Sequence, residues 1–480
     1  MTEQDPSRAR GSRPITTGRV RRMVPLVGAT GRTAGEAVAA ALQRRVRGGE
    51  PDAAARHARA ADRYVELLGR SRGVLMKAGQ ILSFVSPGAP SSVESAAQRS
   101  IYQAAMQRLQ ADAPPMDPEL AASVVETELG TSLNRSFADF APEPIAAASI
   151  GQVHRARLRD GREVVVKVQY PGVEEAIRAD LDNVELLGTF LRLARTTVPS
   201  MTRIDVRSVV AEVGERITEE LDYRLEAASQ TAFAEAYRGH PFIRVPSIVP
   251  ELSGRRVLTS DFVDGMRWAE AIEGDRELRD RWGEAIFRFA FGSLRRLRLF
   301  NADPHPGNYL FHPDGAVSFV DFGSVSRFTA EQIAVIQRVV SATVAGDADE
   351  VWQAFAEMGV LDAADAPTPA EMLGWYAQGL ENLTGEQPFT HTPEFAAETL
   401  AHRYSPTGDW GRVARRLRLP PEYLFLTRID LGIIAVLGEL GATGHWEAIR
   451  KEWDESGPPA TPLGVQDFEF WADRPAGVLP

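Results

Sequence analysis

The sequence of 480 residues contains no cysteine, which excludes disulfide bonds, zinc sites with cysteine ligands and a cysteine nucleophile. Lysine is almost as scarce. It occurs only at Lys77, Lys167 and Lys451, while nearly every other cation is arginine. Lysine is a compact point charge, whereas arginine is a broad planar fork. The three lysines therefore indicate positions where a point charge is needed, unless they are an accident of an arginine-rich composition.

A surplus of positive charge and a long hydrophobic run are also missing. The net charge of −11 argues against a partner nucleic acid, because a phosphate backbone requires a basic face. No stretch reaches the ~18 uncharged apolar residues of a spanning helix, and the N-terminal residues lack the apolar core of a signal peptide. These absences predict a cytoplasmic protein. Residues 7–35 hold seven arginines and no acid, which predicts either a solvated tail or a peripheral contact with an anionic membrane surface.

The hydropathy pattern alternates between strands and helices. Residues 154–169 read HRARLRDGREVVVKVQ and predict a β-hairpin that turns at Asp160-Gly161. Two further short strands are predicted at 309–311 and 317–319, on either side of a Pro-Asp-Gly turn. Helical spacing is found over residues 173–194, 206–225 and 280–300. This mixture predicts an α+β fold.

Two residues match the phosphate-binding pair of a kinase. Phosphoryl transfer needs held phosphates, metal ions and a positioned nucleophile. Lys167 ends a Val-Val-Val strand, as the phosphate-binding lysine of a kinase does. Glu220 lies on a later helix and is predicted to orient Lys167, with Glu219 and Glu226 as competitors. Taken singly, each of these residues would be an ordinary surface residue of a strand or helix.

Three more residues follow in the order that a kinase uses. Asp303 and Asn308 lie five residues apart in Asp-Pro-His-Pro-Gly-Asn, and Asp321 opens an Asp-Phe-Gly turn. Asp303 is predicted to act as the base or to orient the phosphate, while Asn308 and Asp321 are predicted to bind Mg²⁺ through oxygen atoms. A plain proline-rich turn is the alternative for the first motif, and chance is the alternative for the second.

The glycine-rich phosphate loop of most kinases is absent. Ala146, Ala147, Ala148 and Ser149 stand in its place, just before the first hairpin strand. Alanine Cβ atoms let phosphates approach the backbone less freely than glycine does. This pattern predicts a nucleotide-binding turn of altered geometry, and an ordinary alanine-rich connection is the alternative.

The sequence resembles the UbiB/AarF/ADCK family of atypical protein-kinase-like proteins. The resemblance rests on strings that occur in the family's order: KAGQ at 77–80, AAASIGQVH at 146–154, VVVKVQ at 164–169, EELDYRLEA at 219–227, DPHPGN at 303–308 and DFG at 321–323. It covers roughly residues 70–330. Three features depart from the family's pattern: Asn301 stands where His is common, Leu225 occupies a commonly basic position, and the residues after KAGQ are unusual.

The resemblance implies a two-lobed protein-kinase-like fold that binds ATP or ADP with Mg²⁺. It implies that a helical extension folds over the active site, with Lys77 and Gln80 facing the nucleotide and occluding protein substrates. It also implies that the alanine-rich turn favours ADP-like binding. The implied activity is that of an ATP-dependent phosphotransferase or ATPase that supports isoprenoid quinone or lipid metabolism, with a quinone or lipid intermediate as partner.

These features together predict five segments: a basic, flexible leader over 1–50, the helical KxGQ extension over 51–130, a kinase-like N-lobe over 131–265, a kinase-like C-lobe over 266–362, and a helical C-terminal extension with a polar tail over 363–480.

Three other functions stay open at this point. A non-catalytic, nucleotide-gated module that binds lipids or partners is compatible with the alanine-rich turn. An ordinary protein kinase is less compatible, because no Ala-Pro-Glu and no long activation segment follow Gly323. A helical scaffold with a decayed site would be expected to have lost some of Lys167, Asp303, Asn308 and Asp321.

Overall fold

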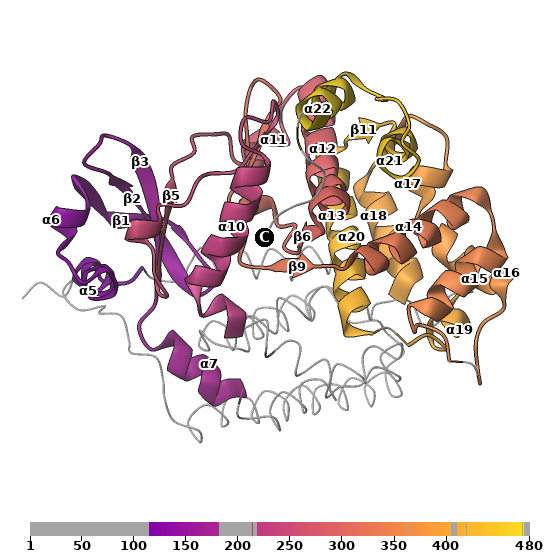
Figure 1. Cartoon of the computed structure of the whole chain (residues 1–480), viewed down its shortest axis with the longest axis horizontal. Coiled ribbons are helices and arrows are strands. Elements are labelled where there is room, and N and C mark those ends of the chain that lie inside the picture. Colours follow the sequence, from indigo (N-terminus) through magenta and orange to yellow (C-terminus); the bar gives the residue numbers. More distant parts are fainter. Residues whose placement is uncertain are drawn as a thin grey trace, which may run out of the picture. The chain divides into compact units, whose positions relative to one another are not determined.

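The computed structural model describes residues 115–181, 214, 218–362, 364–404, 410–418, 420–472 and 474. These residues form two compact units (Figure 1). One unit holds residues 115–181 and 252–259, and the other holds the described part of 214–251 and 260–474. Lys77, Gln80 and most of the helix predicted over 173–194 lie outside the described residues. The domain boundaries expected from the sequence stay predictions.

The first unit is built on a four-stranded sheet in the order β1-β2-β3-β5. Its strands are β1 (Asp139–Ala147), β2 (Gly151–Arg157), β3 (Glu163–Gln169) and β5 (Val257–Asp261), the last of which runs on into the second unit. β2 and β3 pair antiparallel and are the predicted hairpin. In its turn, the Asp160 carboxylate accepts hydrogen bonds from the backbone N–H and the Nε of Arg162. Val164, Val166 and Val168 are fully buried, because alternate strand residues share one face.

Three helices belong to the first unit: α5 (Pro118–Leu129), α6 (Leu133–Ser136) and α7 (Val173–Leu181). α5 packs against β1 and β3. Glu128, near the end of α5, accepts a hydrogen bond from the backbone N–H of Arg255 and forms an ion pair with Arg256 at 3.0 Å. The helix is therefore tied to the residues that precede β5.

The second unit is mostly helical (Figure 1). Its helices are α10 (Tyr223–Ala236), α11 (Trp268–Ala271), α12 (Arg276–Phe287), α13 (Ser293–Leu297), α14 (Ala330–Ala345), α15 (Ala348–Glu357), α16 (Pro369–Ala377), α17 (Glu381–Thr384), α18 (Pro393–Tyr404), α19 (Gly411–Ala414), α20 (Pro421–Leu440), α21 (Trp446–Asp454) and α22 (Pro462–Ala472). A π-helical turn, Arg288–Gly292, joins α12 to α13. Among the described helices, none is both long and apolar enough to cross a bilayer.

The helix predicted over 206–225 is wrong at its C-terminal end. The described helical residues 218–220 stop at Leu221, and a new helix, α10, begins at Tyr223. Asp222 is the N-cap of α10, because its carboxylate accepts a hydrogen bond from the backbone N–H of Arg224 at 3.1 Å. Leu225, the last residue of the predicted helix, is 51% exposed as a result.

Short strands hold the loops of the second unit in place. β4 (Ile243–Arg244), β8 (Val317–Phe319) and β7 (Tyr309–Phe311) form one sheet in that order, and β7 and β8 are the second predicted hairpin. β6 (Leu299–Asn301) pairs antiparallel with β9 (Val325–Arg327). Another pair, β10 (Phe389–Thr390) and β11 (Thr443–Gly444), lies in the C-terminal part of the unit.

An aromatic core lies directly behind the predicted Asp-Phe-Gly turn. The Phe322 side chain is 1% exposed, and its ring centroid is 5.0 Å from that of Phe233 on α10. Phe289, in the π-helical turn, contacts both of these rings and stacks on Phe319 of β8 at 3.6 Å. The turn that carries Asp321 is therefore anchored by a buried ring.

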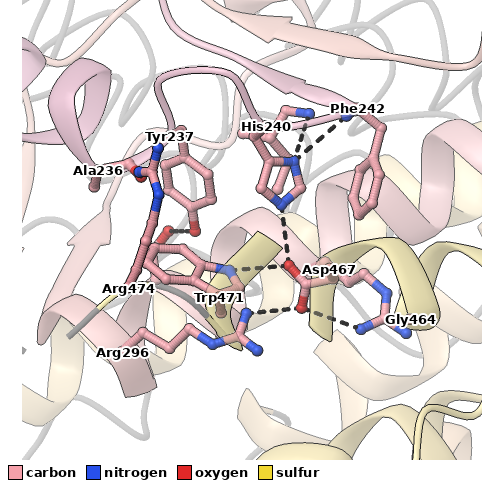
Figure 2. Close-up of polar contacts among 12 residues, drawn as sticks. Ala236, Tyr237, His240, Phe242, Arg296, Gly464, Asp467, Trp471 and Arg474 are labelled. Atoms are coloured by element: carbon pink, nitrogen blue, oxygen red, sulfur yellow. Dashed lines mark hydrogen bonds and ion pairs between the residues drawn. The ribbon is translucent and has the colours of Figure 1, made fainter. Parts of the chain in front are cut away.

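Buried polar contacts join helix α22 to the residues that follow α10 and to α13 (Figure 2). Asp467, which is 2% exposed, accepts hydrogen bonds from Nε2 of His240 at 3.0 Å and from a guanidinium N–H of Arg296 at 2.7 Å. Trp471 donates to the same carboxylate. Arg474 donates to the backbone carbonyl of Ala236, the last residue of α10, and to that of Arg238 just beyond it. Residues more than two hundred positions apart are thus joined in one network.

A buried histidine makes this unit sensitive to acid. His391 is 0% exposed beside Phe389, Phe395 and Trp446, and neither ring nitrogen has a hydrogen-bond partner among the described residues. Burial lowers the pKa of His391 to about 3 in the folded chain. In the unfolded chain this histidine has an ordinary pKa of about 6.5. Between the folded and the unfolded pKa, the unfolded chain therefore binds a proton that the folded chain does not. Stability is therefore complete above the unfolded pKa and is lost as the pH falls below it.

We expect His391→Phe to reduce this loss. At pH 5 the unpaired imidazole costs about 2 kcal/mol of folding free energy, and a phenyl ring at this position cannot take up a proton. The measurement is urea unfolding at pH 8 and pH 5 for the native chain and the variant. The same change at His402, which is exposed on α18, is the control. An equal loss of stability in the native chain and His391→Phe between the two pH values would contradict the prediction.

Candidate functional site

The loop after β6 carries Asp303 and Asn308 in a fixed arrangement. Residues 306–308 form a 3₁₀ turn capped by His305, whose Nδ1 accepts a hydrogen bond from the backbone N–H of Gly307 at 3.0 Å. The side-chain amide of Asn308 donates to the backbone carbonyl of Asp303 at 3.0 Å and to its carboxylate Oδ2 at 3.2 Å. The five-residue spacing of the sequence motif is therefore the span of one closed loop.

The β7–β8 hairpin brings Asp321 to this loop. The backbone N–H of Val320 donates to the backbone carbonyl of Asn308 at 3.1 Å, and Asp321 is the next residue. Oδ1 of Asp321 accepts a hydrogen bond from the N–H of Gly323 at 3.0 Å, which closes the Asp-Phe-Gly turn. Asp303, Asn308 and Asp321 are thus gathered at one end of a hairpin within the second unit.

The donor set fits a hard divalent cation. An asparagine side chain offers two N–H donors and one carbonyl oxygen. Because the Asn308 amide nitrogen faces Asp303, its carbonyl oxygen is directed elsewhere. Mg²⁺ is commonly held by one or two protein oxygens, with phosphate oxygens and water completing its octahedron. Asn308 and Asp321 would supply such oxygens. No described cluster of three or more histidine or acidic side chains offers an all-protein metal cage.

Glu226, one of the three candidate acids, lies beside this turn. It is 8% exposed in the first turn of α10. A Cβ built on Gly323 would lie 3.5 Å from Oε2 of Glu226 and 3.4 Å from Oδ1 of Asp321. Glu219 and Glu220 belong to the helical segment before Asp222, where Glu219 is exposed and Glu220 is half-buried. The N-cap at Asp222 separates them from α10, and this cap was the signal that could have favoured Glu226.

Lys167 lies on β3 of the first unit. It pairs with Val153 of β2, which in turn pairs with Ala146 of β1, so the three side chains share one face of the sheet. The prediction of a loop at Ala146 and Ala147 is wrong, because both residues end β1. The connection is a short turn at 148–150, in which the backbone N–H of Ala148 donates to the carbonyl of Gly151 at 2.9 Å. Ser149 lies within it.

Buried hydrogen bonds of Gln152 and His154 hold the strand that follows this turn. The backbone N–H of Met116 donates to Oε1 of Gln152, and the Gln152 amide nitrogen bonds Nε2 of His154 at 2.8 Å. Nδ1 of His154 lies 2.9 Å from the backbone carbonyl of Ala141. Both side chains are at most 1% exposed, and burial lowers the pKa of His154. The string GQVH after the alanines therefore has a structural role.

Comparison with known proteins identifies the family. Residues 108–355 match the family described as the ABC1 atypical kinase-like domain. The chain belongs to this family. It is 33% identical over 60% of its length to "Protein ACTIVITY OF BC1 COMPLEX KINASE 1, chloroplastic" of Arabidopsis thaliana, and 27% identical over 82% of its length to "Atypical kinase COQ8, mitochondrial" of Saccharomyces cerevisiae. These matches span 41% and 75% of the two relatives.

A solved structure agrees with this ABC1 assignment. The chain is 32% identical to the protein in "The complex structure of Rv3197-erythromycin from Mycobacterium tuberculosis", with a TM-score of 0.59. The match covers 82% of this chain and 95% of that one. The predicted α+β, protein-kinase-like fold is thereby confirmed, and so is the resemblance to UbiB/AarF/ADCK proteins. This ABC1 chain is an atypical kinase-like protein.

The Asp303–Asn308 loop also packs against the C-terminal part of the second unit. Gly432 of α20 faces Pro304, and a Cβ added to Gly432 would overlap Cγ of that rigid ring. We expect Gly432→Ala to displace the loop and to lower the activity of the site, at a cost of about 1–3 kcal/mol in stability. Phosphate release and thermal unfolding measure the two effects. In Gly292→Ala, the control, the new Cβ would meet Trp453 at an ordinary 3.5 Å. Native-like activity in Gly432→Ala would contradict the packing argument.

Proposed function

We propose that this chain binds ATP or ADP with Mg²⁺ and either hydrolyses ATP or transfers its phosphoryl group to a small, non-protein acceptor. The observation that carries the proposal is the arrangement at the β7–β8 hairpin. The amide nitrogen of Asn308 donates to Asp303, and the backbone carbonyl of Asn308 accepts the N–H of Val320, the residue before Asp321. Bound Mg²⁺ would neutralise charge that develops on the phosphates.

Each residue of the site has a proposed role. Asp303 orients the attacking group or accepts its proton, and Asn308 and Asp321 hold the cation. Lys167 contacts the phosphates, and Glu226 replaces Glu220 as the favoured acidic partner of the nucleotide site. The turn that follows Ala147 approaches the phosphates with alanine side chains in place of glycine. By family resemblance, Lys77 and Gln80 restrict access for protein substrates, which disfavours an ordinary protein kinase.

The acceptor or client is proposed from the resemblance. It would be an isoprenoid quinone or lipid intermediate, reached from the cytoplasmic side of a membrane with an anionic surface. A non-catalytic version of the same proposal uses nucleotide occupancy only to gate lipid or partner binding. Turnover separates the two versions, because only the enzyme releases phosphate.

A second candidate function is macrolide binding. The solved structure is named as a complex with erythromycin, and the match to this chain covers 95% of the protein in that structure. The two proteins are 32% identical, and the match covers most of both chains. A surface that binds a macrolide is therefore a specific hypothesis for this chain too.

Phosphate release from ATP tests these proposals together. The native chain would be assayed with and without Mg²⁺, then with anionic liposomes, a quinone head-group analogue or erythromycin. Mg²⁺-dependent release supports the enzyme, and stimulation by one addition assigns the client class. Tight nucleotide binding without release under any condition would favour the gated module. Absence of nucleotide binding would reject both versions.

A further inference from the structure

Asn301 connects the two motifs of the site through both ends of its side-chain amide. Its Nδ2 donates a hydrogen bond to the backbone carbonyl of Asp321 at 2.8 Å. Its Oδ1 accepts a hydrogen bond from the backbone N–H of Asp303 at 3.3 Å. One side chain therefore touches the residue that begins the Asp-Pro-His-Pro-Gly-Asn loop and the residue that begins the Asp-Phe-Gly turn.

The backbone fixes these two motifs to each other at the Asn308 end of the loop, where the N–H of Val320 donates to the carbonyl of Asn308, but it leaves a gap at the Asp303 end. The β6–β9 ladder joins residues 299–301 to 325–327, and the backbone N–H of Ala302 donates to the carbonyl of Ser324 at 2.6 Å. The ladder ends at this contact. Asp303 lies one residue after Ala302, and Asp321 lies three residues before Ser324. The Asn301 side chain spans this gap.

Packing does not fix Asp303 completely either. A cavity of about 10 Å³ lies beside it, lined by Asn301, Asp303, Tyr309 and apolar side chains of the surrounding core. Close packing normally holds core side chains in one position, and a gap of this kind, about the size of one water molecule, removes part of that restraint. The amide bridge adds a constraint on Asp303 beside this cavity.

We propose that Asn301 is a positioning residue that sets the separation between the Asp303 loop and the Asp321 turn, and thereby the Mg²⁺ affinity of the site. This inference rests on the proposed function for its metal. The chemistry required at this position is one donor and one acceptor on the same side chain. Asparagine and neutral histidine provide both, whereas aspartate provides acceptors only and leucine provides neither.

Four variants test the proposal through Mg²⁺ affinity. Binding of a fluorescent ADP analogue would be titrated with Mg²⁺ in the native chain, N301H, N301D and N301L, with Asn134→Leu on α6 as the matched control. Because groups that orient a metal ligand contribute about 10–100-fold to metal affinity, we expect N301D and N301L to need at least about ten times more Mg²⁺. N301H should stay close to the native value. Native-like Mg²⁺ affinity in N301L, or equal losses in N301H and N301L, would overturn the proposal.

Hydrogen exchange of the metal-free, nucleotide-free protein gives a second readout. N301L and N301D should exchange faster than the native chain in residues 299–305 and 320–327, and N301H should not. If the native chain shows no Mg²⁺-dependent binding, the proposed function fails, and hydrogen exchange still decides whether Asn301 joins the two motifs. If N301L does not fold, the comparison of N301H with N301D decides the question. Unchanged exchange in N301D would overturn the bridge.

Discussion

Asp321→Asn is expected to abolish Mg²⁺-dependent phosphate release, with a loss of at least about 10²-fold. The carboxylate is the charged oxygen donor that the hairpin brings beside Asn308, and a neutral amide binds a hard dication far more weakly. The fold should persist, because the carbonyl oxygen of the substituted amide can still accept the N–H of Gly323. Nucleotide binding should lose its dependence on Mg²⁺ while thermal unfolding stays near that of the native chain.

Asp314→Asn is the matched control for this prediction. Asp314 lies in the turn at the other end of the same β7–β8 hairpin, where its side chain is 55% exposed and pairs with Arg244. It makes the same kind of turn contact as Asp321, because Oδ1 accepts the backbone N–H of Ala316 at 3.0 Å. Phosphate release should therefore survive in Asp314→Asn. Equal activities of the two variants would show that Asp321 is not a metal ligand.

Arg288→Met is expected to lower the free energy of unfolding by about 3–5 kcal/mol. The Arg288 guanidinium is 1% exposed in the π-helical turn. It donates to Glu284 at 2.6 Å and to both carboxylate oxygens of Glu452 at 2.6 and 2.8 Å. Methionine fills similar space but leaves these buried carboxylates without their cation. Desolvation then makes the remaining negative charges costly.

An exposed arginine that also pairs with two glutamates provides the control. Arg338 pairs with Glu350 at 2.8 Å and with Glu357 at 2.6 Å, but its side chain is 42% exposed. Solvent screens such pairs, so Arg338→Met should cost no more than about 1 kcal/mol. Chemical denaturation of both variants measures the difference. Similar losses would mean that burial does not determine the contribution of these ion pairs.

The sequence could predict those parts of the site whose geometry is local. Asp303, Asn308 and Asp321 come together because one closed loop and one short hairpin separate them, and spacing with a Pro-Asp-Gly turn is enough to predict that. The hairpin around Asp160 was predictable for the same reason. These elements depend on turn chemistry and alternation over fewer than twenty residues.

The remaining features depend on competition or on distant contacts. Helical periodicity ran through Asp222, but its carboxylate caps a new helix, and Glu226 is buried in the first turn of that helix. Pairing with β2 extended β1 through Ala146 and Ala147, although alanine has little strand preference. The approach of Gly432 to Pro304 and the His240–Asp467 contact join positions far apart in the chain. No local pattern encodes such contacts.

Calorimetric titration of ADP into the native chain, with Mg²⁺ and with a chelator, tests the central claim most directly. We expect saturable binding that is at least about tenfold tighter with Mg²⁺, because Asn308 and Asp321 would add protein oxygens to those of the phosphates. Binding of equal strength in both conditions would contradict the metal site at the hairpin. No binding in either condition would contradict the nucleotide-binding function itself.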